Sequence, residues 1–222
     1  MKRFIRLTAL LLALLFALTA CGSGSDDPTT TAAAGETAAA DGPSTSSRDR
    51  VKFTMENGGS FVIELYPEYA PDTCDNFKKL VASGFYDGLT FHRIVDGFMA
   101  QGGDGSDSAK ASEAQPIYGE FASNGFSQNT LSHQRGVVSM ARTNDPNSAS
   151  SQFFICYGDA SFLDGKYAAF GKVVEGMETV DDFCKVERVY NSMGELAMPK
   201  EPLGIATVSY THLRAHETEL HL

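Results

Sequence analysis

The side chains best suited to chemistry are long polar groups that interrupt short apolar segments. Arg93 lies in the segment 91–95, and Gln101 and Gln152 lie in two similar segments. The two-residue period of a β-strand places each of them on one face with apolar neighbours: Arg93 with Phe91 and Val95, Gln101 with Met99, and Gln152 with Phe154. Converging faces would form an apolar pocket edged by a guanidinium and two amides. The alternative is that Arg93 extends along a barrel rim with its charge in water and that the glutamines end their strands.

Other catalytic constellations are missing from the sequence. It contains no GxSxG nucleophile elbow, no GxxxxGKS or GxxxxGKT phosphate loop, no GxGxxG dinucleotide loop and no HExxH zinc motif. Between residues 51 and 208 the only histidines are His92 and His133. Strand alternation turns His92 away from Arg93, which favours a structural role for it. We therefore expect neither a metal site nor a cofactor.

The cysteines offer little reactive chemistry. Cys74, Cys156 and Cys184 remain once Cys21 is assigned to the N-terminal segment. An odd number argues against a disulfide framework, although one bridge with a free thiol remains an alternative. No CxxC pair is present, so we expect all three to be small buried hydrophobic residues.

The elements that must position these side chains are short strands and two helices. The expected strands are Val51–Met55, Ser60–Leu65, Thr90–Val95, Phe98–Gln101, Gly136–Ala141, Gln152–Cys156, Ala168–Val174 and Gly204–Val208. A helix is expected after Pro71, with Asp72 as its cap and Gly84 as its end, and a second one from Met177 to Lys185. Many short strands with two helices favour a closed antiparallel barrel over an alternating βαβ sheet.

The N-terminus has the features of an export signal. Lys2, Arg3 and Arg6 precede an apolar run from Leu7 to Ala20, which is shorter than the roughly 18 residues that span a bilayer. Small residues before Cys21 resemble a bacterial lipobox, in which that cysteine is lipidated. We expect residues 1–20 to be a lipoprotein signal peptide; an ordinary secretory signal is the alternative. The mature protein would then be extracytoplasmic and anchored to the bacterial cell membrane through lipid.

Composition divides the rest of the chain. Residues 21–50 are expected to be the lipidated cysteine plus a disordered linker, because the linker lacks large apolar side chains. Residues 51–208 form the domain, and 209–222 a non-native or disordered tail, whose three histidines match no metal motif. The full chain has 18 basic and 28 acidic residues, a net charge of −10. This balance argues against nucleic acid as a partner.

Five motifs resemble the cyclophilin-type peptidyl-prolyl cis-trans isomerases. They are FHRI at 91–94, GFMAQGGD at 97–104, SMA at 139–141, SQFFI at 151–155 and FLDGK at 162–166. The resemblance implies a mainly β fold, a closed eight-stranded antiparallel β-barrel capped by two α-helices. It also implies a monomer without cofactors that acts on proline-containing polypeptides. Its implied catalytic residue is Arg93, and its implied substrate-binding residues are Phe98, Met99, Gln101, Ala141, Arg142, Gln152, Phe154, Phe162, Leu163 and Tyr167.

The chain departs from the family pattern at the pocket edge. Phe162 stands where many eukaryotic relatives have Trp, Tyr167 replaces a frequent His, and Arg142 stands where Asn is usual. The segment 188–202 is longer than in compact relatives, and the sequence assigns it no function. Two other functional classes remain open, a non-catalytic proline-binding module or chaperone and a surface adhesion factor.

Overall fold

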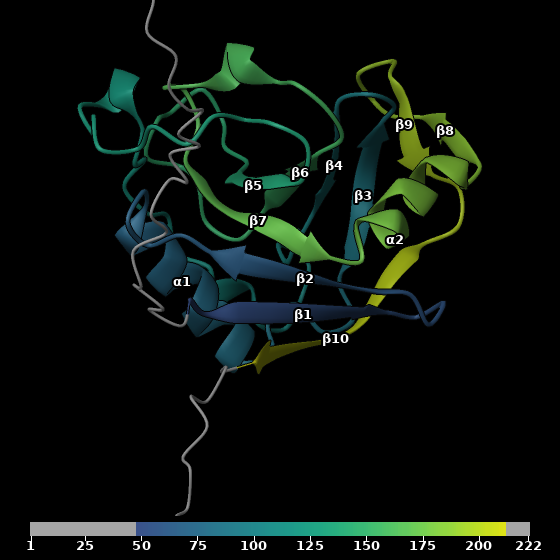
Figure 1. Cartoon of the computed structure of the whole chain (residues 1–222). Coiled ribbons are helices and arrows are strands. Elements are labelled where there is room, and N and C mark those ends of the chain that lie inside the picture. The colour runs from purple at the N-terminus through teal and green to yellow at the C-terminus, as the bar shows by residue number, and fades with distance from the viewer. Residues whose placement is uncertain (1–47, 212–222) are drawn as a thin grey trace, which may run out of the picture. The chain divides into compact units, whose positions relative to one another are not determined.

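Eight antiparallel strands close into a barrel in the order β1-β10-β3-β4-β6-β5-β7-β2 (Figure 1). The computed structural model describes residues 48–211. The barrel strands are β1 Arg50–Met55, β2 Ser60–Leu65, β3 Thr90–Val95, β4 Met99–Gly102, β5 Val137–Met140, β6 Phe153–Cys156, β7 Ala169–Glu175 and β10 Leu203–Thr211. The expected closed barrel is confirmed, with strand ends displaced by one residue at several positions.

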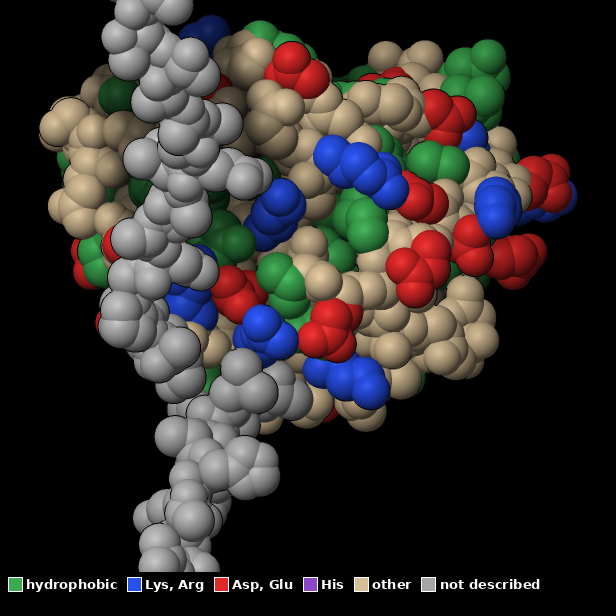
Figure 2. Space-filling model, in the orientation of Figure 1, with side chains coloured by type: hydrophobic (Ala, Val, Ile, Leu, Met, Phe, Trp, Pro, Cys, Tyr) green, Lys and Arg blue, Asp and Glu red, His purple; other side chains and the backbone are tan. Residues whose placement is uncertain are grey.

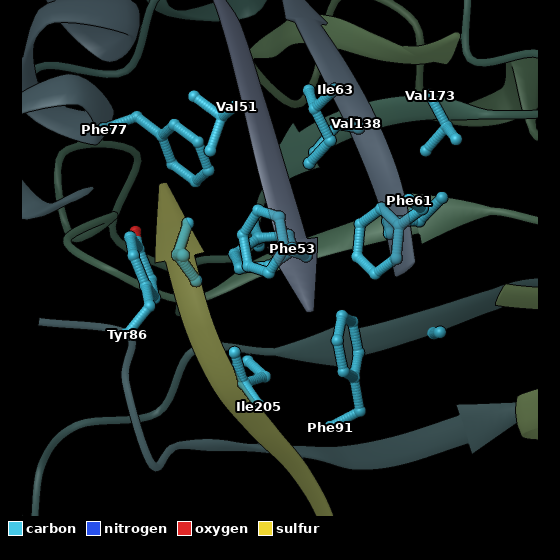
Figure 3. Close-up of a cluster of buried hydrophobic side chains, with 14 of the residues drawn as sticks. Val51, Phe53, Phe61, Ile63, Phe77, Tyr86, Phe91, Val138, Val173 and Ile205 are labelled. Carbon is cyan, nitrogen blue, oxygen red and sulfur yellow. The ribbon is translucent and has the colours of Figure 1, made fainter. Parts of the chain in front are cut away.

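The barrel interior is filled by alternate side chains of each strand. In β1 every second residue, Val51, Phe53 and Met55, is buried, and β2 follows the same alternation. Phe53 pairs directly with Phe61 across the two strands, and their rings stack with centroids 4.9 Å apart. Figure 3 shows these rings and Phe91 gathered inside the barrel. Aromatic side chains supply the core volume, although the chain has no Trp.

Two α-helices cover the barrel at opposite ends of β1 and β2 (Figure 1). Helix α1 Pro71–Ala82 inserts Phe77 among Phe53, Phe153 and Phe170. Helix α2 Met177–Asp182 continues into a 3₁₀ turn whose Phe183 meets the other end of the core. The four 3₁₀ helices among the described residues are η1 Ala111–Glu113, η2 Ala122–Asn124, η3 Ser161–Leu163 and η4 Phe183–Lys185.

The expected cap of α1 is wrong. Asp72 is inside the first turn, the N-cap position is Ala70, and Ala70 makes no side-chain cap. The carboxylate of Glu120 instead accepts the backbone N–H groups of Asp72 and Thr73 at 3.0 and 2.8 Å, together with the Thr73 hydroxyl at 2.6 Å. A residue remote in sequence thus satisfies the free donors of the helix N-terminus.

Both boundaries of the domain differ from the expected ones. β1 begins at Arg50, and Arg48 already forms ion pairs with Glu64 and Glu68. β10 runs to Thr211 because residues 209–211 pair with β1, so this part of the expected tail belongs to the barrel. The expected signal peptide, Cys21, the linker up to residue 47 and residues 212–222 lie outside the described residues. No helix within 48–211 is long and apolar enough to cross a membrane.

The three cysteines of the domain are free, and two of them are fully buried. Burial raises the pKa of Cys74 and of Cys156 to about 12. Cys184 is only half-buried, so the expectation of three buried hydrophobic residues is wrong for this one. It lies in η4 and packs against the core with part of its surface exposed.

A two-stranded sheet lies outside the barrel. Its strands, β8 Arg188–Tyr190 and β9 Leu196–Pro199, form a hairpin beside β3 (Figure 1). On the face drawn in Figure 2, basic and acidic side chains alternate over the barrel. That face therefore lacks the uninterrupted positive surface typical of nucleic-acid binding.

Candidate active site

A β-bulge in β3 sets the direction of Arg93. Phe91 faces Gly102 of β4 and Arg93 faces Gln101, so one extra residue, His92, is inserted between them. Phe91 and Ile94 consequently point into the core, while Arg93 points outward. The expected shared face of Arg93 and Phe91 is wrong for this reason. The shared face with Val95 is confirmed, since Val95 packs on an outer apolar cluster.

The outer apolar cluster forms the floor of a pocket next to Arg93. In β4 and β6 the alternation expected from the sequence is confirmed: Ala100, Phe153 and Ile155 point into the core, and Met99 and Phe154 point outward. The residues that line the pocket are Arg93, Phe98, Met99, Gln101, Ala141, Arg142, Phe154, Leu163 and Tyr167. Its volume is about 280 Å³. This volume lies just below the lower end of the range for drug-sized ligands, about 300 Å³.

A chain of hydrogen bonds joins the three polar side chains found in the sequence. Arg93 Nη1 donates to Gln101 Oε1 at 3.4 Å, and Gln101 Nε2 donates to Gln152 Oε1 at 2.9 Å. The predicted convergence of one guanidinium and two amides is therefore present in the structure. Arg93 lies at the pocket wall with its side chain 26% exposed, which differs from the alternative of a fully solvated rim charge.

A second hollow continues the groove past Gln101. It is lined by Gln101, Ala141, Arg142, Thr143, Ser148, Ser150 and Gln152. The guanidinium of Arg142 lies 4.5 Å from the ring centroid of Tyr167 and donates to the Lys166 carbonyl, which holds its long side chain in place. The backbone N–H of Ala141 donates to the Gln152 carbonyl at 2.9 Å, so this N–H is not available to a bound peptide.

The two phenylalanines assigned by resemblance differ in position. Phe98 precedes β4, in a turn, and is therefore released from the strand alternation that would have turned it away; it lines the pocket. Phe162 is 61% exposed and is not among the lining residues. Its ring lies 5.6 Å from that of Phe98, which places Phe162 at the outer rim of the pocket.

A hydrogen-bonded network beneath the pocket had no signal in residue spacing. His133 Nδ1 is 2.8 Å from Asp164 Oδ1, and its Nε2 is 3.0 Å from Ser139 Oγ. The His133 ring stacks under Phe154 with centroids 6.0 Å apart. Burial lowers the pKa of His133 despite the nearby carboxylate. His133 and Ser139 are fully buried, so this end of the network supports the pocket floor, whereas Asp164 is partly exposed.

His92 does not line the Arg93 pocket. Strand alternation predicted that His92 faces away from Arg93, but this argument does not hold, because the bulge interrupts the alternation at His92. It lines a separate hollow with residues of β9, among them Met198 and Pro199. Its Nδ1 has no hydrogen-bond partner among the described residues, and burial lowers its pKa. This position fits the structural role expected for it.

Sequence reasoning missed one residue at the site. Glu195 precedes β9 and forms a bidentate ion pair with Arg93, with Oε2 at 2.6 Å from Nε and Oε1 at 2.8 Å from Nη2. No residue pattern in the sequence indicated it, because Glu195 lies before β9 and meets Arg93 only through the packing of the hairpin along β3.

The chain has extensive similarity to known proteins. Residues 50–208 match the family model for cyclophilin type peptidyl-prolyl cis-trans isomerase/CLD. A peptidyl-prolyl cis-trans isomerase of Acinetobacter baylyi is 42% identical over 158 residues, covering 68% of this chain and 80% of that protein. Peptidyl-prolyl cis-trans isomerase-like 3 of Gallus gallus is 43% identical over 141 residues, covering 62% and 86%.

Solved structures agree with the sequence matches. A cyclophilin type isomerase of Cryptosporidium parvum has a TM-score of 0.62 at 28% identity, covering 74% of this chain and 98% of that one. The same protein in the presence of the dipeptide Ala-Pro has a TM-score of 0.59 at 29% identity, covering 72% and 96%. With this barrel and this match over most of its length, the chain belongs to the cyclophilin-type peptidyl-prolyl cis-trans isomerases.

Proposed function

We propose that the chain accelerates rotation about X-Pro bonds in proline-containing polypeptides, with Arg93 as the catalytic donor. The supporting observation is that Arg93 stands at the wall of a pocket with an apolar floor, beside Met99 and Phe154. A structure of a related cyclophilin in the presence of Ala-Pro is consistent with a proline-containing ligand here.

The chemistry of the X-Pro bond explains why a guanidinium suits this position. Rotation must cross a barrier of roughly 18–20 kcal/mol, set by resonance between the prolyl nitrogen and the carbonyl. In the twisted transition state this resonance is broken, and the nitrogen gains a lone pair that accepts a hydrogen bond. A donor such as Arg93 then stabilises the transition state without stabilising the planar ground state, which is the condition for a higher turnover.

The hydrogen bond from Arg93 supplies only part of the required energy. A rate gain of about 10⁵ corresponds to roughly 7 kcal/mol. One charge-assisted hydrogen bond contributes about 1.5–3 kcal/mol. We assign the remaining transition-state stabilisation to apolar contacts between the pocket and the proline ring and to hydrogen bonds from Gln101 and Gln152. These two amides line the second hollow and would hold the flanking peptide while the other side turns.

An isomerisation assay on a short X-Pro peptide tests this mechanism. We expect Arg93→Ala to lower kcat/KM by at least about tenfold, which corresponds to the loss of about 1.4 kcal/mol of transition-state stabilisation. Arg135→Ala is the matched control, because Arg135 pairs with Asp181 at the surface and lines neither hollow. An Arg93→Ala protein with the control's activity would refute the role of Arg93. An inactive wild type that still binds the peptide would favour the non-catalytic module.

We further propose that the enzyme acts on exported chains while attached to the membrane by lipid on Cys21. Support comes from the basic and apolar order of residues 1–20, from the small residues before Cys21, and from the linker composition that follows. Uncatalysed X-Pro isomerisation takes tens to hundreds of seconds, slow enough to limit the folding of such chains. Mass spectrometry of the mature protein should show a modified Cys21 as its first residue, and an unmodified N-terminus at another position would refute the anchor.

A further inference from the structure

The β8–β9 hairpin carries a side chain that reaches the active site. In β9, Ala197 and Pro199 are buried, whereas Leu196 and Met198 are half exposed, at 50% and 42%. This alternation assigns the odd-numbered residues to the face that packs along β3. Glu195 lies just before β9, at the end of the turn. Its carboxylate meets the Arg93 guanidinium of β3 directly.

Glu195 occupies one edge of the Arg93 guanidinium and leaves the other edge to the pocket. Its two oxygens accept from Nε and Nη2 of Arg93. The remaining nitrogen, Nη1, points toward Gln101 Oε1 and Met99 Sδ, at 3.4 and 3.8 Å, on the pocket side. Glu195 is not among the residues that line the pocket. The carboxylate thus binds the edge of the guanidinium that faces away from the pocket. It does not block access to Nη1 from the pocket side.

Hydrogen bonds within the hairpin turn hold Glu195 in place. Asn191 Oδ1 accepts the backbone N–H groups of Met193 and Glu195, both at 3.0 Å, and Asn191 Nδ2 donates to Glu195 Oε2 at 3.2 Å. At the base of the hairpin, Arg188 pairs with Asp96 just after β3 at 2.7 and 2.8 Å. The hydrogen bond from Arg93 lowers the pKa of Glu195, so the carboxylate is charged at neutral pH.

We propose that Glu195 is a positioning residue that fixes the Arg93 guanidinium in the orientation required for isomerisation. This inference rests on the proposed role of Arg93. An arginine side chain has many rotamers, and only those that aim a nitrogen into the pocket are productive. The planar fork of Arg matches a carboxylate bidentately, so the ion pair selects one orientation of the whole guanidinium plane. The hairpin 188–202 would then act on the active site through this one contact.

A double-mutant cycle tests the inference with the full chain. The four proteins are wild type, Glu195→Ala, Arg93→Ala and the double variant, assayed for kcat/KM on a short X-Pro peptide. We expect Glu195→Ala to lower kcat/KM by about tenfold, equal to about 1.4 kcal/mol, and to have no effect when Arg93 is already absent. Glu195→Gln, which keeps one acceptor oxygen, should fall between Glu195→Ala and wild type.

The matched control is Glu187→Gln, immediately before β8 at the base of the same hairpin. Glu187 pairs with Lys200 at the surface and should leave kcat/KM unchanged. A second readout is the Arg93 Nε–H resonance in a ¹H–¹⁵N spectrum, assigned by its loss in Arg93→Lys. We expect this proton to exchange slowly with water in wild type and in Glu187→Gln, and rapidly in Glu195→Ala.

The outcomes separate this inference from the function on which it rests. A Glu195→Ala protein that is as active as wild type, or more active, would overturn the positioning role. An equal loss from Glu195→Ala with and without Arg93 would also overturn it, because the effect would then not pass through Arg93. In both cases a strong loss in Arg93→Ala would leave the proposed mechanism intact. Full activity of Arg93→Ala would overturn both proposals.

Discussion

The cap of helix α1 by Glu120 gives a stability prediction that the structure allows to be sized. Glu120 is 1% exposed, and its carboxylate accepts three hydrogen bonds from Asp72 and Thr73 at the helix N-terminus. Glu120→Gln keeps the shape but replaces one acceptor oxygen with an NH₂ group that faces a donor. One charge-assisted hydrogen bond, about 1.5–3 kcal/mol, is lost, and so is the favourable charge at the helix N-terminus, about 0.3–2 kcal/mol.

We therefore expect Glu120→Gln to lower the free energy of unfolding by about 3 kcal/mol. For a domain of this size each kcal/mol shifts Tm by roughly 2–4 °C, which gives a decrease of about 6–12 °C. Urea unfolding followed by circular dichroism measures the free energy, and the m value should not change. Glu201→Gln is the matched control, because Glu201 is exposed. If the two variants unfold within about 0.5 kcal/mol of each other, Glu120 does not carry the cap.

Two further predictions concern the pocket and the histidines. Leu163→Ala removes three carbon groups from the pocket, which at about 0.8 kcal/mol each is about 2.4 kcal/mol, so kcat/KM on an X-Pro peptide should fall by up to about 60-fold; an unchanged value would exclude Leu163 from proline binding. Burial lowers the pKa of His92 and His133 in the folded state, so protonation below the unfolded pKa of about 6.5 favours unfolding. Tm should fall as pH decreases from 7 to 5.5, and a constant or rising Tm would contradict this.

Most of the fold could be predicted because the alternation of apolar and polar residues within each short segment indicates a barrel strand. Strands such as β1 and β2 alternate buried and exposed residues with period two, and Gly58, with φ of 86°, marks the turn between them. Gln101 and Gln152 were found in the same way, since one face of each segment had to be buried. The motifs around Arg93 then identified the family from the sequence alone.

Errors occurred where the outcome depended on contacts between distant residues. The bulge at His92 depends on how β3 pairs with β4, so alternation within β3 placed Phe91 and Arg93 on the same face incorrectly. The end of β10 at Thr211 depends on pairing with β1, and composition gave no sign of it. In the same way, Asp72 is a good local cap, but Glu120 satisfies the same donors from elsewhere in the chain.

The sequence by itself indicated the side chains that line the pocket, because its motifs resemble a known family and because strand periodicity places Met99, Gln101 and Phe154 on outer faces. Only the tertiary structure decided what surrounds Arg93. Glu195 is separated from Arg93 by 102 positions, and their ion pair exists because the β8–β9 hairpin packs along β3. His133 likewise stacks on Phe154 because the fold brings the two segments together. Such contacts arise when segments that are distant in the sequence pack against each other, which no local pattern encodes.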